Sequence, residues 1–312
     1  MKKLLSLLLS ILLVACLAVT FTSCGEAKSE SNEAVSPITY TFKLVKDGDD
    51  KSYTLTSFAL SEEAKEFVDE EDWDGLAKLF TNKLPAEIKG DKTAYSSASV
   101  RKLVIPSKWG KDEIPVTKIA EGAISNQSFI KELVVPSTVK EIELGAFSGL
   151  VNLEKITLPF IGKKLGAKNG EKLFGYIFGT IGSDKLTSVT QTYNDGAENN
   201  TASYYIPSNL KTVVVTGKVD AIKKPYRYDI NEDNEHIENL ENGEYELIIV
   251  SYDESAVQPY AFHNVAMLEN VVFEGEITAI PDYAFYGCSF KTLDFTDSTI
   301  VTIGKYAYAN CL

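Results

Sequence analysis

The side chains that could carry chemistry are few in this chain and lie far apart in its sequence. The two histidines are His236 and His263. A Ser-x-x-Lys spacing, which can place a lysine beside a nucleophilic serine, occurs at 137–140 and again at 208–211. Both serines follow an aliphatic residue and a proline, so we interpret them as one repeated turn and not as nucleophiles. The sequence holds no His-Glu-x-x-His, Gly-x-Ser-x-Gly or phosphate-loop motif. We therefore predict neither an enzyme nor a bound cofactor.

One acidic segment resembles the start of a calcium-binding loop. Residues 229–233 read Asp-Ile-Asn-Glu-Asp, which places acidic and amide side chains at alternating positions. Asn234 stands where such a loop requires glycine, and Leu240 stands where it requires a bidentate glutamate. A solvated acidic insertion explains the segment better than a calcium site does, so no metal site is predicted.

A repeated dipeptide indicates the elements that carry these side chains. Alanine followed by phenylalanine, isoleucine or tyrosine recurs at a stride of 23 residues, and the one long gap, between Ala146 and Ala261, is five times 23. A period of 20–29 residues is typical of a leucine-rich-repeat solenoid, whose units bury their apolar faces by stacking. The pairs begin at Ala123, Ala146, Ala261, Ala284 and Ala307.

Each repeat also contains two apolar residues separated by one position, which predicts a short strand with both side chains inside. The residue between them should point outward, and this outward row contains neither an aromatic platform nor a charge cluster. The predicted inward residues are Leu133, Val135, Ile156, Leu158, Val271, Phe273, Leu293 and Phe295. The predicted outward residues are Val134, Thr157, Val214, Val272 and Asp294.

Two segments carry a resemblance to a known family. Residues 135–159 (VPSTVKEIELGAFSGLVNLEKITLP) and 277–295 (ITAIPDYAFYGCSFKTLDF) resemble the BspA-like leucine-rich repeats of bacterial surface proteins. The resemblance implies a β-rich solenoid of 23-residue repeats over 101–312 and a role in adhesion or partner binding. The repeat pattern is interrupted at about 160–209 and 218–258.

Two cysteines, Cys288 and Cys311, occupy the same slot of consecutive repeats. They could be small buried thiols at a coil corner, or they could form a disulfide between stacked coils. Parallel side chains on stacked coils make the torsion of a disulfide difficult, so we favour free thiols.

The segment 38–100 precedes the repeats and reads as a cap, which a solenoid needs to cover its apolar end. Alternating apolar residues around 47–50 predict a hairpin over 38–55. A helical pattern at 61–80 predicts one helix with Trp73, Leu76, Ala77 and Phe80 on one face. No cap pattern precedes Leu312, so we expect either a longer natural chain or an exposed last coil.

The first residues indicate export. Lys2 and Lys3 precede an apolar run over 4–19, and this pattern is typical of a secretory signal. The segment 1–23 resembles a lipoprotein signal peptide, which implies lipidation of Cys24 and an envelope protein facing outward, with 24–37 as a disordered linker. Cleavage before Cys16 fits the lipoprotein consensus better but would leave an apolar stub, and an uncleaved transmembrane anchor is a further alternative.

The charge of the chain limits its partners. The 31 basic and 44 acidic residues give a net charge of −13, which repels nucleic acid and anionic lipid. We expect an extracellular protein or glycan as partner, and membrane contact through the lipid anchor only. The alternative is a structural or accessory envelope lipoprotein, or a fragment of a longer surface protein. Tyrosine-rich pieces of the interruptions could supply contact area or could pack locally, and these are Tyr204, Tyr205, Tyr226, Arg227 and Tyr228.

Overall fold

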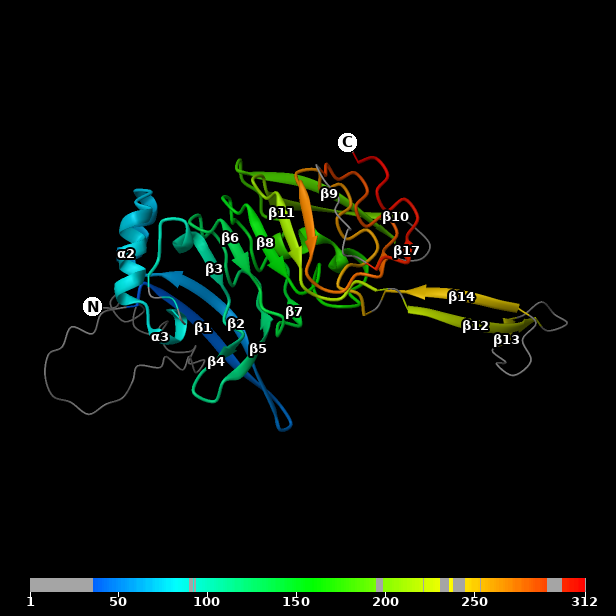
Figure 1. Ribbon diagram of the computed structural model, residues 1–312, viewed down its shortest axis with the longest axis horizontal. Coiled ribbons are helices and arrows are strands. Elements are labelled where there is room, and N and C mark those ends of the chain that lie inside the picture. Colours follow the sequence, from blue (N-terminus) through cyan, green and yellow to red (C-terminus); the bar gives the residue numbers. More distant parts are fainter. Residues whose placement is uncertain are drawn as a thin grey trace, which may run out of the picture.

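The computed structural model describes residues 36–89, 92, 94–194, 199–220, 222–230, 236–237, 245–252, 254–290 and 299–311. A parallel five-stranded sheet in the order β15-β11-β8-β6-β3 runs along the molecule (Figure 1). Each strand belongs to one coil and pairs in register with the next, so that Leu133, Ile156, Val213 and Val271 lie side by side. The strands are β3 (Lys102–Val104), β6 (Glu132–Val134), β8 (Lys155–Leu158), β11 (Thr212–Val215) and β15 (Asn270–Phe273). The predicted leucine-rich-repeat solenoid is confirmed.

The inward face of this sheet forms the core. Leu133, Val135, Ile156 and Leu158 are each at most 1% exposed, as predicted. The next predicted pair, on β15, is partly buried and packs against the same core. Leu293, Phe295 and the predicted outward residue Asp294 lie outside the described residues.

The outward face follows the prediction at every described position except one. Val134 and Thr157 are half-buried and Val272 is 45% exposed, but Val214 is only 3% exposed. Val214 stands between Thr157 and Val272 on a strand that is paired on both sides. Pairing on both sides does not account for this burial, because Thr157 is flanked in the same way and is half-buried.

The alanine-aromatic pairs form one corner of each coil. The corners are linked along the solenoid by hydrogen bonds, such as Phe262 N–H to Ala284 O at 2.8 Å and Phe285 N–H to Ala307 O at 2.9 Å. The Phe262 and Phe285 rings stack with their centroids 5.3 Å apart. A short strand follows the corresponding strand of the sheet in several coils, and these short strands are β5 (Ile114–Ile119), β7 (Glu141–Ile142), β16 (Ala279–Ile280) and β17 (Thr302–Ile303).

Among its described residues, the long gap between Ala146 and Ala261 holds a single intermediate corner. This corner is the 3₁₀ segment η3 (Phe174–Phe178), which follows the short η2 (Asn169–Lys172). It accepts a hydrogen bond from Phe147 N–H through Ile177 O at 3.0 Å, and Phe174 N–H donates to Ala261 O at 2.8 Å. The gap is therefore two coil steps, lengthened by the inserted hairpins in the segments where the sequence predicts interruptions of the repeat.

Two hairpins account for the interruptions of the repeat pattern. The first pairs β9 (Leu186–Asn194) with β10 (Asn199–Pro207). The second pairs β12 (Ile222–Ile230) with β14 (Tyr245–Ser251) and the short β13 (His236–Ile237), and it extends away from the coils (Figure 1). The coil continues on both sides of the second hairpin, because Val219 forms a bridge with Ile277.

The N-terminal module adds strands to the row of short strands. The predicted hairpin is present as β1 (Ile38–Asp47) and β2 (Asp50–Leu60). Strand β2 pairs in parallel with β5, and the two-residue β4 (Lys108–Trp109) pairs with β5 antiparallel. The hairpin thus joins the sheet that contains β5 and β7, and it forms a cap-like region with the helices.

The predicted single helix over 61–80 is two helices, α1 (Glu62–Asp69) and α2 (Trp73–Lys83). Glu71 adopts a positive φ of 55°, which ends the first helix, and the Asp72 carboxylate accepts from Gly75 N–H at 2.8 Å to begin the second. The predicted apolar face of α2 is confirmed at Leu76, Ala77 and Phe80, which are buried. The four-residue α3 (Ala86–Lys89) and η1 (Ser99–Arg101) lead into the repeats.

None of the helices within the described residues has the length and apolar character needed to cross a membrane. The predicted signal segment 1–23, Cys16 and Cys24 lie outside the described residues.

Candidate functional site

A row of tyrosines follows the corners of the last three coils. Tyr260, Tyr283 and Tyr306 each precede the alanine of a corner and each adopts a positive φ, of 67°, 54° and 54°. The shared slot aligns their side chains, so that Tyr260 and Tyr283 stack with centroids 4.6 Å apart and planes inclined by 5°. Tyr283 and Tyr306 follow at 5.2 Å. We call these three residues the tyrosine row.

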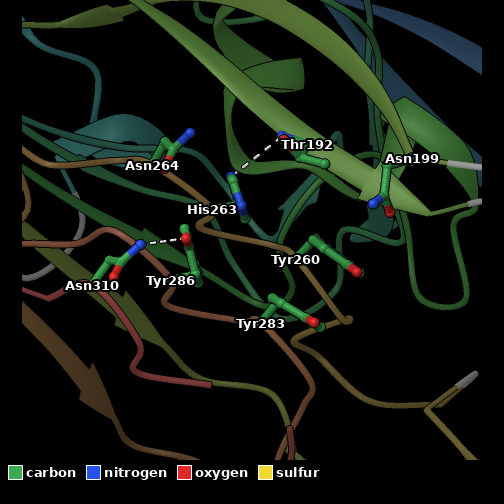
Figure 2. Close-up of a pocket in the computed structure, with 8 residues that line it drawn as sticks. All are labelled: Thr192, Asn199, Tyr260, His263, Asn264, Tyr283, Tyr286 and Asn310. Atoms are coloured by element: carbon green, nitrogen blue, oxygen red, sulfur yellow. Dashed lines mark hydrogen bonds between the residues drawn. The ribbon is translucent and has the colours of Figure 1, made fainter. Parts of the chain in front are cut away.

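A second aromatic row lies three residues further along the same corners. His263 and Tyr286 stack with centroids 4.8 Å apart and planes inclined by 5°. The Asn310 amide donates a hydrogen bond to the Tyr286 hydroxyl, which fixes the end of this row (Figure 2). Tyr283 contacts both rows, because its ring centroid is 6.0 Å from that of Tyr286.

The β9–β10 hairpin supplies the opposite wall of an open cavity of about 540 Å³. Thr192 of β9 and Asn199 of β10 line it from the hairpin side (Figure 2). Thr192 N–H donates to Nδ1 of His263 at 3.4 Å, and the Asn264 amide donates to Thr190 O at 3.2 Å. The cavity therefore lies between an insertion of one coil and the corners of three later coils.

One buried side chain holds this hairpin against the corners. Gln191 is 0% exposed, and its Oε1 accepts from Gly175 N–H at 2.7 Å. Its Nε2 donates to Ala261 O at 3.0 Å. Gln191 thereby joins β9 to two successive corners and positions the adjacent Thr192 over the cavity.

The cavity is lined by neutral polar and aromatic groups. Burial lowers the pKa of His263 to about 4, so that its imidazole is neutral at pH 7. The other described lining residues are tyrosine, threonine and asparagine side chains. Two cations lie against the tyrosine row: the Lys172 ammonium is 5.5 Å from the centroid of the Tyr260 ring, and the Lys305 ammonium is 5.3 Å from that of Tyr306. The arrangement offers hydroxyl and amide groups for hydrogen bonds without a formal charge.

The tyrosines named from the sequence lie elsewhere. Tyr204 is 5% exposed, and its hydroxyl donates to Gly170 O at 3.0 Å. Its ring lies so close to Gly175 that a Cβ there would be 2.4 Å away. Tyr204 thus packs the hairpin onto η3, and its neighbour Tyr205 donates its backbone N–H to Gly179 O. The remaining three residues named, Tyr226, Arg227 and Tyr228, belong to β12, and their side chains lie outside the described residues.

The Ser-x-x-Lys spacings are turns, as interpreted from the sequence. In both, the fourth residue of the turn donates its N–H to the proline carbonyl, and both serines are exposed. Ser208 Oγ donates to Lys185 O at 3.1 Å, whereas the Lys211 ammonium pairs with Glu269 at 2.7 Å. The lysine therefore does not activate the serine. The calcium-like segment lies outside the described residues from 231 to 235, and the described residues contain no cluster of metal ligands.

The two cysteines are free thiols, as predicted. Cys288 is buried and donates to Phe262 O at 3.2 Å, and Cys311 donates to Phe285 O at the same distance. Burial raises the pKa of both thiols, which keeps them protonated at neutral pH. The same slot holds the buried residues Leu150 and Val265 in other coils.

Sequence reasoning missed the tyrosine row because it searched the outward residues of the strands and the interruptions of the repeat, and not the corners of the coils. The signal was present, since tyrosine precedes the corner alanine at 260, 283 and 306 with the stride of the repeat. The hairpin wall carried no such signal, because Thr192 lies 71 residues before His263.

The repeats match one family model, the BspA type Leucine rich repeat region, in six copies over residues 90–225 and 241–312. This match covers more than half of the chain. The chain belongs to the BspA-type leucine-rich repeat family. Neither the curated proteins nor the solved structures contain a match to it. BspA-type repeats are a scaffold that generally mediates protein interactions, and no catalytic domain is evident in the matched regions.

Proposed function

We propose that this BspA-type repeat protein is an exported lipoprotein that binds an extracellular protein or glycan, and that it is not an enzyme. The observation that carries the proposal is the cavity between the β9–β10 hairpin and the tyrosine row. Its walls are held by ring stacking and by buried hydrogen bonds of Gln191 and His263. A preorganised concave surface loses little conformational entropy on binding, which favours recognition of a partner.

The location at the cell surface rests on the first residues of the sequence. Lys2, Lys3 and the apolar run over 4–19 favour export, and Cys24 followed by a polar linker favours a lipid anchor. An anchored repeat scaffold would present its corners and hairpins to the medium outside the cell.

The non-catalytic part of the proposal rests on the chemistry of the cavity. Its one imidazole is neutral and engaged with Thr192 N–H, and no carboxylate or nucleophilic thiol lines it among the described residues. General acid–base catalysis needs a titratable group within reach of the substrate. The amides and phenols present here suit binding instead.

The test is a binding screen with the full chain, kept in a detergent without a sugar head group. The chain is presented to arrayed matrix proteins, mucins and glycans, and hydrolysis of peptide, ester and glycoside substrates is measured in parallel. Saturable binding to at least one partner without turnover is the expected result. Turnover on any substrate, or no binding to any arrayed partner, would contradict the proposal.

A further inference from the structure

The cavity beside the tyrosine row has the chemistry of a carbohydrate site. Its volume of about 540 Å³ lies within the range of roughly 300–1,000 Å³ that is usual for small-molecule sites. It is lined by the amides of Asn199, Asn264 and Asn310 and by phenol groups. Amides and phenols both donate and accept hydrogen bonds, which matches a ligand rich in hydroxyl groups.

The lack of charged side chains on the cavity wall favours a neutral ligand. The residues that line the cavity, all within the described part of the chain, are neutral at pH 7. No lining side chain could pair with the carboxylate or sulfate of an anionic glycan, or with the charges of a peptide. The two ammonium groups near the tyrosine row, those of Lys172 and Lys305, already lie over the rings of Tyr260 and Tyr306. A neutral ligand needs no charged partner.

The geometry of the tyrosine row suits the edge of a sugar ring. The faces of Tyr260 and Tyr283 are covered by stacking, and their phenol oxygens point to the same side in Figure 2. Ring edges and hydroxyls therefore face a ligand, while Tyr306, which is 54% exposed, continues the row past the cavity. A ligand of several sugar units could follow this row from one coil to the next.

We propose that the cavity between the β9–β10 hairpin and the tyrosine row binds a neutral oligosaccharide. The cavity holds one sugar unit through the asparagine amides and the phenol hydroxyls, and the following units extend along the tyrosine row towards Tyr306. This inference rests on the proposed binding function and names its ligand class and site.

Equivalent positions in neighbouring repeats indicate which substitutions would keep the backbone conformation of the corners. Asn264 and Asn310 occupy a slot with positive φ, of 61° and 56°, and Gly287 occupies that slot in the coil between them. Glycine adopts positive φ without strain, so Asn264→Gly and Asn310→Gly remove cavity amides and keep the turn. Asn126, with φ 58°, has the same slot at a corner three steps away and serves as the matched control.

The experiment measures the affinity of the full chain for oligosaccharides by isothermal titration calorimetry, in the same detergent as the binding screen. The probes are maltohexaose, cellohexaose, mannohexaose and an N-acetyllactosamine hexasaccharide, with sialylated and sulfated counterparts. We expect saturable binding to at least one neutral probe and weaker binding of its monosaccharide. The double variant Asn264→Gly/Asn310→Gly should weaken that binding at least ten-fold, and Tyr283→Phe should weaken it several-fold. Asn126→Gly should leave it unchanged, and circular dichroism should show the same strand content in all variants.

Three patterns of binding would overturn this inference. They are binding to the charged probes only, binding to a neutral probe that the double variant leaves unchanged, and binding to a matrix protein with no glycan binding at all. The last result would leave the proposed binding function standing while removing its sugar site. No binding to any protein or glycan would remove both.

Discussion

His263 shows how burial sets the chemistry of a single residue in this protein. It is 7% exposed, it stacks on Tyr286, and its Nδ1 accepts a hydrogen bond from Thr192 N–H. Desolvation disfavours the imidazolium, and protonation of Nδ1 would also remove the acceptor of that hydrogen bond. The neutral ring is therefore part of the folded structure.

This arrangement predicts a loss of stability in mild acid. The pKa of His263 is about 4 in the folded chain and about 6.5 in an unfolded one, so the unfolded state binds more protons between these values. The neutral His263 ring therefore contributes to the free energy of unfolding above pH 6.5. This contribution, on the order of 3 kcal/mol, is lost as the pH falls towards 4. Urea unfolding of wild type and His263→Phe at pH 7 and pH 4.5 measures it. The variant keeps a stacked ring without a titrating group, so its stability should fall less than that of wild type. Equal losses would contradict the prediction.

We also expect the loss of the Gln191 side chain to reduce the stability of the protein. Gln191→Ala leaves the N–H of Gly175 without its buried acceptor, while Ala261 O keeps the bond from Phe174 N–H. An unsatisfied buried donor costs about 1–3 kcal/mol, and we expect a loss of that size in the free energy of unfolding. Thr190→Ala on the same strand removes an exposed hydrogen bond to Ser203 and is the control. A loss no larger in Gln191→Ala than in this control would show that Gln191 does not hold the hairpin.

At the scale of elements, the strand pattern was the most informative part of the sequence. Period-2 apolar pairs placed Leu133, Val135, Ile156 and Leu158 correctly, because a strand with one buried face has only one workable register. The helix break at 70–72 escaped prediction because a positive φ at Glu71 leaves no trace in apolar periodicity. The interruptions at about 160–209 and 218–258 could be located from the missing repeat pattern, but the pattern did not show that they form hairpins.

The buried strand residues give a direct test of the sheet. Leu158 is 0% exposed at the end of β8, where truncation leaves a cavity between stacked coils. Leu158→Ala should reduce the free energy of unfolding by about 2–5 kcal/mol, measured by urea titration. Thr157→Ala, on the opposite face of the same strand, should change it much less. A loss below about half a kilocalorie for Leu158→Ala would contradict the assignment of the core.

At the scale of the whole molecule, the solenoid brings together segments that are distant in sequence. The cavity combines β9, β10 and corners up to Asn310, and only the stacking of coils sets these side by side. Sequence periodicity predicted the scaffold, but it could not predict where an inserted hairpin would fold back. The candidate site was therefore out of reach of sequence reasoning, apart from the tyrosine row.

We predict that a lipid on Cys24 anchors the whole molecule to the membrane. Lipid attachment at Cys24 requires its thiol, so labelled palmitate should enter the wild type and be lost in Cys24→Ser. Cys16→Ser is the matched control and should keep the label. Labelling that persists in Cys24→Ser and disappears in Cys16→Ser would place the anchor at the other cysteine.

The central claim is that the protein binds its ligand between the β9–β10 hairpin and the tyrosine row. Hydrogen exchange of the full chain, with and without the neutral oligosaccharide that binds best, tests it most directly. We predict slower exchange at 190–194, 199–200, 260–264, 283–287 and 306–310, because the ligand would hold these segments together. Slower exchange confined to the hairpin at 222–251 or to the outward face of the five-stranded sheet would contradict the claim.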